Sequence, residues 1–254
     1  AHFLVDAVEM LFAALDARGI ERHFYRYPSP GSVVAFVARA LPLVVQGLTP
    51  AERARISGMG VAMPFQLWSW VQLIGAPQSE MDAWREADIQ AELTRIVDLP
   101  VYVQNDATSA CGAELVFGTG ERPRDFLYFY FGYFIGGGLV LNGQLFLGRT
   151  GNAAGVGPLP VPGPDGRMRR LFAAASMSRL AEAMEAAGES SDHLWERPDQ
   201  WTVSEGLLSA WMDQAAEGLA WATLSAAALL QLAAVMIDAW MPVEVRAAIT
   251  RRTR

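Results

Sequence analysis

Short apolar runs alternate along this chain with longer stretches whose apolar residues recur every three to four positions. The short runs are rich in aromatic and β-branched residues and predict strands, whereas the longer stretches predict amphipathic helices. Strands are expected in residues 2–16 (two runs), 22–27, 56–64, 101–104, 126–135, 139–141 and 235–238. Helices are expected in residues 33–45, 79–97, 107–118, 171–187, 204–232 and 246–254, and Thr49 marks a further helix start.

Asn105 and Asp106 follow directly after the strand expected in residues 101–104. Open α/β sheets bind their ligands at the carboxyl ends of strands, so this pair is a candidate site. Asp106 has the chemistry of a general base toward a hydroxyl group, and the Asn105 amide can hold that hydroxyl by hydrogen bonds. Asn and Asp are also the usual helix-capping residues, so a purely structural role for the pair stays open.

Gly136, Gly137 and Gly138 stand between two apolar runs. Glycine lets a backbone turn with positive φ or approach another group closely. The three glycines therefore predict a Gly-rich turn that cradles phosphate or another ligand, with a plain flexible hairpin as the alternative. The Asn142-Gly143 pair that follows favours a tight two-residue hairpin turn.

Residues 218–237 carry no charged side chain and are long enough to span a bilayer. Alanine dominates this segment, with Ser, Thr and Gln interspersed, and its end is strand-like. Because alanine-rich segments gain little from lipid, we expect a buried helix followed by a strand.

Charge and cysteine content narrow the functional classes. The formal net charge of −7 argues against this chain being a nucleic-acid-binding surface by itself. Cys111 is the single cysteine, which excludes an internal disulfide and a multi-cysteine zinc site. This cysteine content, with no recognisable signal peptide, fits a reducing compartment, so we expect a cytoplasmic protein.

Several motifs occur in a specific order between residues 101 and 161. They are Asn105-Asp106, Glu114, Gly136-Gly137-Gly138, Asn142-Gly143 and the segment GNAAGVGPLPV at 151–161. Together they resemble the core of the ROK family (repressor, open reading frame, kinase). This family groups bacterial sugar kinases with sugar-responsive transcriptional repressors, and the resemblance extends over most of the chain.

The resemblance implies an α/β chain with the two-lobed, actin-like or sugar-kinase-like fold of the ribonuclease H type. We expect an N-terminal lobe in residues 1–98, a C-terminal lobe in residues 99–254 and a cleft around Asp106. A ROK domain normally continues beyond the last helix expected here. We therefore expect that both ends are truncated and that a helix-turn-helix lies upstream, outside this chain.

The resemblance also implies roles for single residues. Asn105, Asp106, Glu114 and Asn152 would contact a sugar, and Asp106 would be catalytic only in a kinase. Gly136, Gly137 and Gly138 would form the phosphate loop. Trp68 and Trp70 would either stack on a sugar or pack in the core.

Some positions depart from the family pattern. The Glu that contacts the sugar falls on Gly155, and the zinc-binding His falls on Pro158. The zinc-binding cysteines are missing, so no metal is expected. The glycines that meet ATP phosphate after Asp6 are absent. Trp240 stands in the turn near adenosine, where it would either fill the space that a purine needs or stack on one.

These departures favour a sugar-sensing effector domain of a ROK-type transcriptional regulator that is not an enzyme and needs no cofactor. The alternative is an ATP-dependent sugar kinase that uses ATP and Mg²⁺, with Asp106 as general base. A pseudo-enzyme that serves in oligomerisation is a third hypothesis. The expected partners are a small sugar or sugar derivative and DNA, the latter only through a segment outside this chain. No membrane partner is expected, and exposed Trp and Phe side chains favour a homodimer or higher homo-oligomer.

Overall fold

A computed structural model describes the backbone of residues 3–4, 7–13, 17–24, 29–66, 68, 77–118 and 123–253. Side chains are described within these ranges from residue 29 onward, except that of Glu80. Asp6 and Trp70 lie outside the described residues, so the predictions made for them stay open. The chain divides into two compact units, Ala1–Asp106 and Ala107–Arg254. This division into compact units does not test the lobe boundary that we expect between residues 98 and 99, so that boundary stays a prediction.

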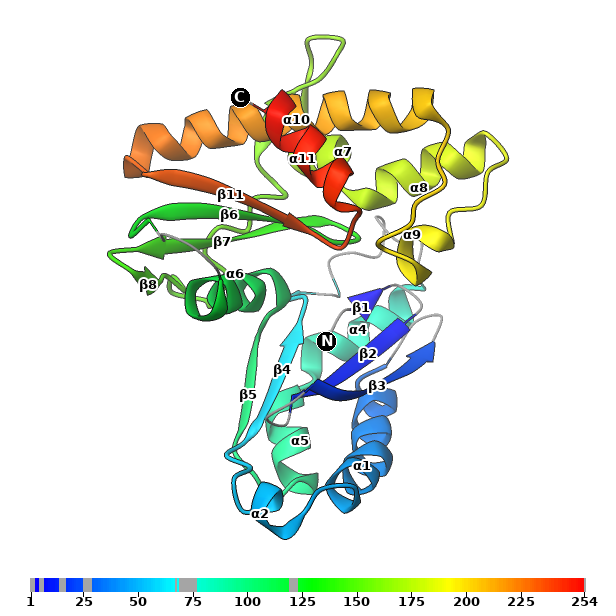
Figure 1. The fold of residues 1–254 in the computed structure, drawn as a ribbon, viewed down its shortest axis with the longest axis vertical. Coiled ribbons are helices and arrows are strands. Elements are labelled where there is room, and N and C mark those ends of the chain that lie inside the picture. The colour runs from blue at the N-terminus through cyan, green and yellow to red at the C-terminus, as the bar shows by residue number, and fades with distance from the viewer. Residues whose placement is uncertain are drawn as a thin grey trace. The chain divides into compact units, whose positions relative to one another are not determined.

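The first unit contains two small sheets and four described helices (Figure 1). One sheet is antiparallel, in the order β1-β2-β3, and the other is the parallel pair β4-β5. Its strands are β1 (Phe3–Leu4), β2 (Ala7–Ala13), β3 (Ala17–Phe24), β4 (Met59–Met63) and β5 (Val101–Asn105). Its helices are α1 (Pro30–Gln46), α2 (Pro50–Arg53), α4 (Gln78–Glu86) and α5 (Ile89–Ile96). Arg18 and Gly19, which fall between the strands expected in residues 2–16 and 22–27, lie inside β3.

Helix starts in the first unit follow the capping rules. The Thr49 hydroxyl accepts a hydrogen bond from the Glu52 N–H, and the Glu52 carboxylate accepts one from the Thr49 N–H over 2.8 Å. The helix start predicted at Thr49 is therefore confirmed. The single helix predicted over residues 79–97 is wrong, because it is broken between α4 and α5. Asp88 caps α5 there by accepting from the Ala91 N–H over 2.9 Å.

A buried cluster of apolar side chains lies between the β4-β5 pair and the helices of the first unit. Leu93 of α5 is fully buried in it, and Trp68 packs against its edge. The position of Trp68 supports the packing alternative over stacking on a sugar. The remaining fully or nearly fully buried members are Val33, Val37, Met59, Met63, Met81, Trp84, Ile89, Val97 and Val101.

The second unit is built on a four-stranded sheet in the order β11-β6-β7-β8. β11 runs parallel to β6, whereas β7 is antiparallel to both β6 and β8. Asn142 and Gly143 have φ values of 55° and 72° and connect β7 to β8, which confirms the predicted tight turn. The strands are β6 (Phe126–Phe131), β7 (Ile135–Leu141), β8 (Gln144–Leu145) and β11 (Ala234–Ala239), with a separate hairpin of β9 (Pro160–Pro162) and β10 (Met168–Arg170).

Helices cover both faces of this sheet (Figure 1). One face meets α6 (Asp106–Phe117), which continues from the first unit into the second. The other meets α7 (Leu171–Ala175), α8 (Met177–Ala186), α9 (His193–Glu196), α10 (Glu205–Leu230) and α11 (Val243–Arg252). The single helix expected over residues 171–187 is therefore wrong, since Ser176 divides it into α7 and α8.

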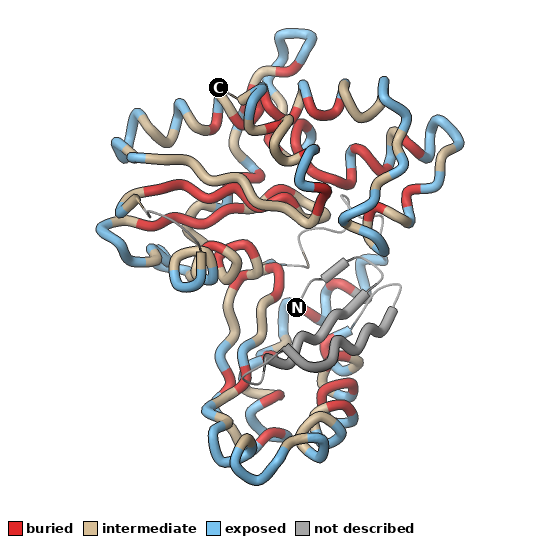
Figure 2. Tube along the Cα trace, viewed as in Figure 1, coloured by how far each residue is buried: buried red, intermediate tan, exposed pale blue. Residues whose placement is uncertain are grey.

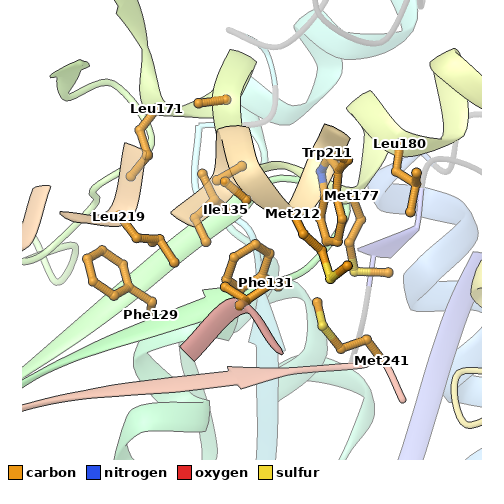
Figure 3. Close-up of a cluster of buried hydrophobic side chains, with 14 of the residues drawn as sticks. Phe129, Phe131, Ile135, Leu171, Met177, Leu180, Trp211, Met212, Leu219 and Met241 are labelled. Carbon is orange, nitrogen blue, oxygen red and sulfur yellow. The ribbon is translucent and has the colours of Figure 1, made fainter. Parts of the chain in front are cut away.

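β6 is the central strand of this core. All six of its residues are buried (Figure 2). Its side chains belong alternately to the two core clusters on either face of the sheet. Phe129 and Phe131 face the α7, α8, α10 and α11 side, where Trp211 and Met241 pack beside Phe131 (Figure 3). Tyr128 faces α6. The continuous apolar run seen in the sequence is thus a strand buried on both faces.

The uncharged segment 218–237 contains the second half of α10 and most of β11, as predicted. Leu219 and Ala222 of α10 are buried in the core of the second unit. None of the described helices combines the length and hydropathy that crossing a bilayer requires.

Candidate functional site

Asn105 and Asp106 occupy the junction between β5 and α6. Asn105 is buried, pairs in register with Met63, and donates its backbone N–H to the Gln104 Oε1 over 2.7 Å. Asp106 is partly buried at the first position of α6, where the helix dipole favours its negative charge. The fold thus places an amide and a carboxylate together at the carboxyl end of a parallel strand. Their contact with a ligand stays a prediction.

Glu114 lies on the same helix as Asp106 but toward its other end. A rise of ~1.5 Å per residue separates the two residues by about 12 Å along the axis of α6. Glu114 is partly buried near Cys111, whose pKa is raised to about 12, first by burial and then by the Glu114 charge. The two carboxylates are therefore held at different ends of α6, and the role of Glu114 as a sugar contact stays a prediction.

Gly136, Gly137 and Gly138 lie inside β7, paired with residues 128–130 of β6. The Gly-rich turn predicted at these positions is therefore wrong, because the chain reverses at residues 132–134 instead. A Cβ atom on Gly136 would lie 2.8 Å from the Cβ of Ala107, and one on Gly138 would collide with Cys111. The glycines thus let the first turns of α6 lie directly against the sheet. Their role as a phosphate loop stays a prediction.

Asn152 lies in the loop that connects β8 to β9. It is partly buried, and its side-chain Nδ2 would lie 3.4 Å from a Cβ atom on Gly155. Gly155 itself is exposed, whereas Val156 beside it is buried in the core of the second unit. Asn152 is therefore next to the position where the ROK pattern has its sugar-contacting Glu. Ala154 adopts a left-handed backbone conformation, with a φ of 58°.

Aromatic side chains fill the turn between β6 and β7. The Tyr133 ring lies 5.6 Å from Trp195 of α9 and 4.9 Å from Phe134. The Phe134 ring lies 5.4 Å from Phe172 of α7. This turn follows the carboxyl end of β6, where an open sheet would receive a ligand. Here the rings of Tyr133 and Phe134 contact Trp195 and Phe172 and are partly buried.

Backbone groups of the same turn are also engaged. The Ile135 N–H donates to the buried Ser176 Oγ over 3.0 Å, and the Tyr133 carbonyl accepts from the Ser178 N–H over 3.1 Å. The Gly132 N–H donates to the Phe134 carbonyl over 3.3 Å. These bonds fix the turn onto the start of α8. A phosphate would have to compete with them for the N–H groups of Gly132 and Ile135.

Asp238 stands near the carboxyl end of β11, beside the turn that contains Trp240. Its Oδ2 accepts a hydrogen bond from the Tyr128 hydroxyl over 2.6 Å, and its Oδ1 forms an ion pair with Arg246 Nη1 over 2.6 Å. Oδ1 also accepts from the Ala239 N–H over 2.8 Å. Burial, followed by the bond to Asp238, raises the pKa of Tyr128.

Asp238, Arg246 and Tyr128 are not among the site residues predicted from the sequence. The available signal was an acidic residue at the end of an apolar strand, the same signal that pointed to Asp106. Among the residues that the structure describes, no group of three or more His, Cys, Asp or Glu side chains has the arrangement of a metal site.

The class of fold follows from likeness to a solved structure. A ROK family glucokinase from Streptomyces griseus, in complex with glucose and AMPPNP, superposes with a TM-score of 0.66. The match covers 99% of this chain and 88% of that chain at 17% identity. The chain therefore has the α/β, two-lobed, actin-like fold of the sugar kinases, as predicted.

Residues 12–170 match the model of the ROK family, so the chain belongs to the ROK family. The family assignment made from the sequence motifs is thus confirmed.

The chain is similar to both functional branches of this family. A glucokinase of Streptomyces coelicolor is 35% identical over 162 residues, which are 64% of this chain and 49% of the glucokinase. A xylose repressor of Bacillus subtilis is 24% identical over 112 residues, which are 44% of this chain and 28% of the repressor. The chain thus spans less than half the length of each of these two relatives, and sugar kinases and repressors both occur among its relatives.

Proposed function

We propose that this chain is the sugar-sensing effector domain of a ROK-type transcriptional regulator. The proposal rests on the side-chain contacts at the carboxyl ends of β6 and β11. The turn after β6 carries Tyr133 and Phe134, whose rings contact Trp195 and Phe172, and the end of β11 holds the Asp238–Arg246 ion pair. A domain that only senses a sugar needs no nucleotide at this edge of the sheet.

Sugar binding requires groups directed at hydroxyls, and the chain keeps several of them. Asn105 and Asp106 lie at the carboxyl end of β5, and Asn152 offers an amide in the loop before β9. In a sensor, the Asp106 carboxylate accepts a hydrogen bond from a sugar hydroxyl without removing its proton. Charge-assisted bonds of this kind are stronger than neutral ones, so Asp106 would supply much of the affinity.

Phosphoryl transfer requires more than sugar binding, and the contacts of the second unit do not favour it. It depends on backbone and metal groups that position and neutralise the transferred phosphate. Gly136, Gly137 and Gly138 lie within a strand against α6, and the neighbouring turn is bonded to Ser176 and Ser178. These contacts support a domain that binds a sugar but transfers no phosphate.

The end of β11 supports the same conclusion. A purine near this turn would have to share the space with Trp240 and with the bridge from Asp238 to Arg246 of α11. This bridge joins the last strand of the sheet to the helix that follows it. We therefore propose that the domain functions without ATP and without a metal ion.

The rival function is an ATP-dependent sugar kinase, in which Asp106 would be the general base and the cofactors would be ATP and Mg²⁺. The similarity to the Streptomyces coelicolor glucokinase favours it, because this relative has the higher identity of the two compared. The structural match that holds glucose and AMPPNP also belongs to a kinase. Both functions place the sugar at Asp106, so the binding of ATP and the fate of the sugar distinguish them.

An Asp106→Asn variant tests the sensor function. The substitution keeps the shape of the side chain but removes the charge, so we expect the affinity for glucose or xylose to fall by roughly tenfold or more. Isothermal titration calorimetry would measure the sugar affinity of the unsubstituted chain first and then that of the variant. Asp98→Asn is the matched control, since Asp98 is exposed and precedes β5.

The same samples distinguish the sensor from the kinase. Incubation with MgATP and the bound sugar should yield no sugar phosphate above the rate of a blank without protein. Turnover that disappears in Asp106→Asn but persists in Asp98→Asn would establish the kinase and refute the sensor.

The remaining parts of the proposal concern the complete protein. A DNA-binding segment outside this chain would respond to the sugar through a coupling free energy between the two sites. We also propose a cytoplasmic homodimer or higher homo-oligomer, in keeping with exposed aromatic side chains such as Phe117 and Trp221.

A further inference from the structure

Arg169 presents an unusual guanidinium group in the second unit. It lies on β10, opposite Val161 of β9, and its Nη1 donates to the Oε1 of Gln214 on α10 over 2.8 Å. Its Nε and Nη2 atoms are buried and have no hydrogen-bond partner among the residues that the structure describes. Gln214 thus holds the Nη1 side of the guanidinium, while the N–H groups of Nε and Nη2 have no acceptor among the described residues.

The two unsatisfied donors of Arg169 belong together. In a planar guanidinium, the N–H groups on Nε and Nη2 point the same way and form one of the forks that bind a carboxylate or phosphate through two parallel bonds. Gln214 fixes the direction of this fork by holding Nη1. A buried charged donor without an acceptor is costly, so such a fork favours an acceptor that carries negative charge.

The surroundings of the fork are basic on the hairpin side. Arg167 and Arg170 flank Arg169 and are exposed. Asp165 is the acidic residue of the hairpin loop, and its Oδ1 accepts from the Arg167 N–H over 3.1 Å. Glu217 lies one turn beyond Gln214 on α10 and is exposed. Asp165 and Glu217 are therefore the side chains that could compete with an external anion.

We propose that Arg169 is the core of a binding site for one oxyanion group, a carboxylate or a phosphate, of a small ligand. The loop of residues 164–167, which precedes β10, is exposed, and its movement is the proposed way for the ligand to reach the fork. The site lies on β10 and α10 and uses none of the residues assigned to the sugar. It is independent of the proposed sensor function and stands or falls separately.

Phosphate and acetate test the site on the unsubstituted chain. Inorganic phosphate is titrated while its ³¹P line width is followed. Thermal unfolding is measured with phosphate, acetate and chloride at equal ionic strength. At ten times the dissociation constant we expect phosphate or acetate to raise the midpoint by about 3–5 °C over chloride. The anion that gives the larger shift identifies the preferred group.

Variants separate the fork from general effects of the anions on stability. Arg169→Lys keeps the charge but loses the fork, and should weaken the anion affinity roughly tenfold. Arg167→Gln, in the same hairpin, should leave the affinity unchanged because the Arg167 side chain is 90% exposed. Gln214→Glu places a carboxylate beside Arg169 and should abolish the anion response while the chain stays folded.

Equal shifts in the unsubstituted chain and in Arg169→Lys or Gln214→Glu would overturn the proposal, as would the absence of any shift over chloride. A shift that appears only when Asp165→Asn and Glu217→Gln are combined would overturn it as well. In that case the fork is occupied by the chain's own acids.

Discussion

Asp106 and Asp238 each stand near the carboxyl end of a strand that runs parallel to a neighbouring strand of its own sheet. Asp238, near the end of β11, is bound by the Tyr128 hydroxyl and by Arg246, and Asp106 is the first residue of α6. An acid that already bridges a strand and a helix is a structural element of the sheet edge. An acid at a helix start after a strand retains the geometry that a ligand site requires. The proposed function therefore requires that Asp106, and not Asp238, contacts the sugar.

Ala154 is the second residue of interest, because it adopts φ = 58° in the loop that carries Asn152. An L-residue in this conformation costs about 1–2 kcal/mol, which glycine avoids. The greater freedom of glycine in the unfolded chain offsets part of this gain. We therefore expect Ala154→Gly to raise the free energy of unfolding by up to about 1 kcal/mol. Urea denaturation would measure it.

Ala153→Gly serves as the control, because Ala153 is not among the residues with positive φ. It should lower the stability slightly. Equal losses in both variants would show that the loop at Ala154 is not strained.

At the scale of elements, the approach of α6 to β7 is what positions Asp106. Ala107 and Cys111 of α6 face Gly136 and Gly138, and any side chain on these glycines would push the helix away. The glycine run therefore acts on the site through packing. A shift of α6 would move Asp106 together with the helix.

Gly138→Ala tests this packing. The added methyl group would collide with Cys111, so we expect a loss of about 1–3 kcal/mol in the free energy of unfolding. The change should also weaken any sugar binding that depends on Asp106. Gly206→Ala in the first turn of α10 has open space around it and should be neutral or slightly stabilising. Stability of Gly138→Ala equal to that of Gly206→Ala would refute the close packing of α6 on β7.

The sequence was sufficient to predict elements with strong local signals. The Asn142-Gly143 turn, the capping box at Thr49 and the helix followed by a strand in residues 204–239 were all predictable from neighbouring residues. The helix breaks at Asp88 and Ser176 were missed. Ser176 is stabilised by partners that are distant in sequence, since it accepts from Ile135 and its carbonyl accepts from Trp211.

The candidate site was only partly predictable for the same reason. Asn105 and Asp106 are visible because they follow an apolar run directly. The Tyr128–Asp238 bond joins residues 110 positions apart, so no local pattern reveals it. Gly136 to Gly138 were assigned to a turn because glycine serves both turns and close packing. The position of Cys111 and Ala107 on the facing helix decides between the two.

At the level of the whole molecule, the chain combines the fold of sugar kinases with sheet-edge turns whose side chains contact one another and the neighbouring helices. Tyr133, Phe134 and Phe172 fill one turn of the sheet edge, and Asp238 with Arg246 bridges another. Binding of a sugar at Asp106 does not require these positions to be open. We therefore expect this chain to bind a sugar without binding ATP.

Thermal unfolding of the chain with a panel of sugars, each with and without MgATP, tests this expectation most directly. A ligand that binds only the folded state raises the unfolding midpoint, by about 3–5 °C at ten times its dissociation constant. We expect at least one sugar to raise the unfolding midpoint and MgATP to raise it no further. Glucose and xylose are the first sugars to try. A midpoint raised by MgATP, or unmoved by every sugar, would contradict this expectation.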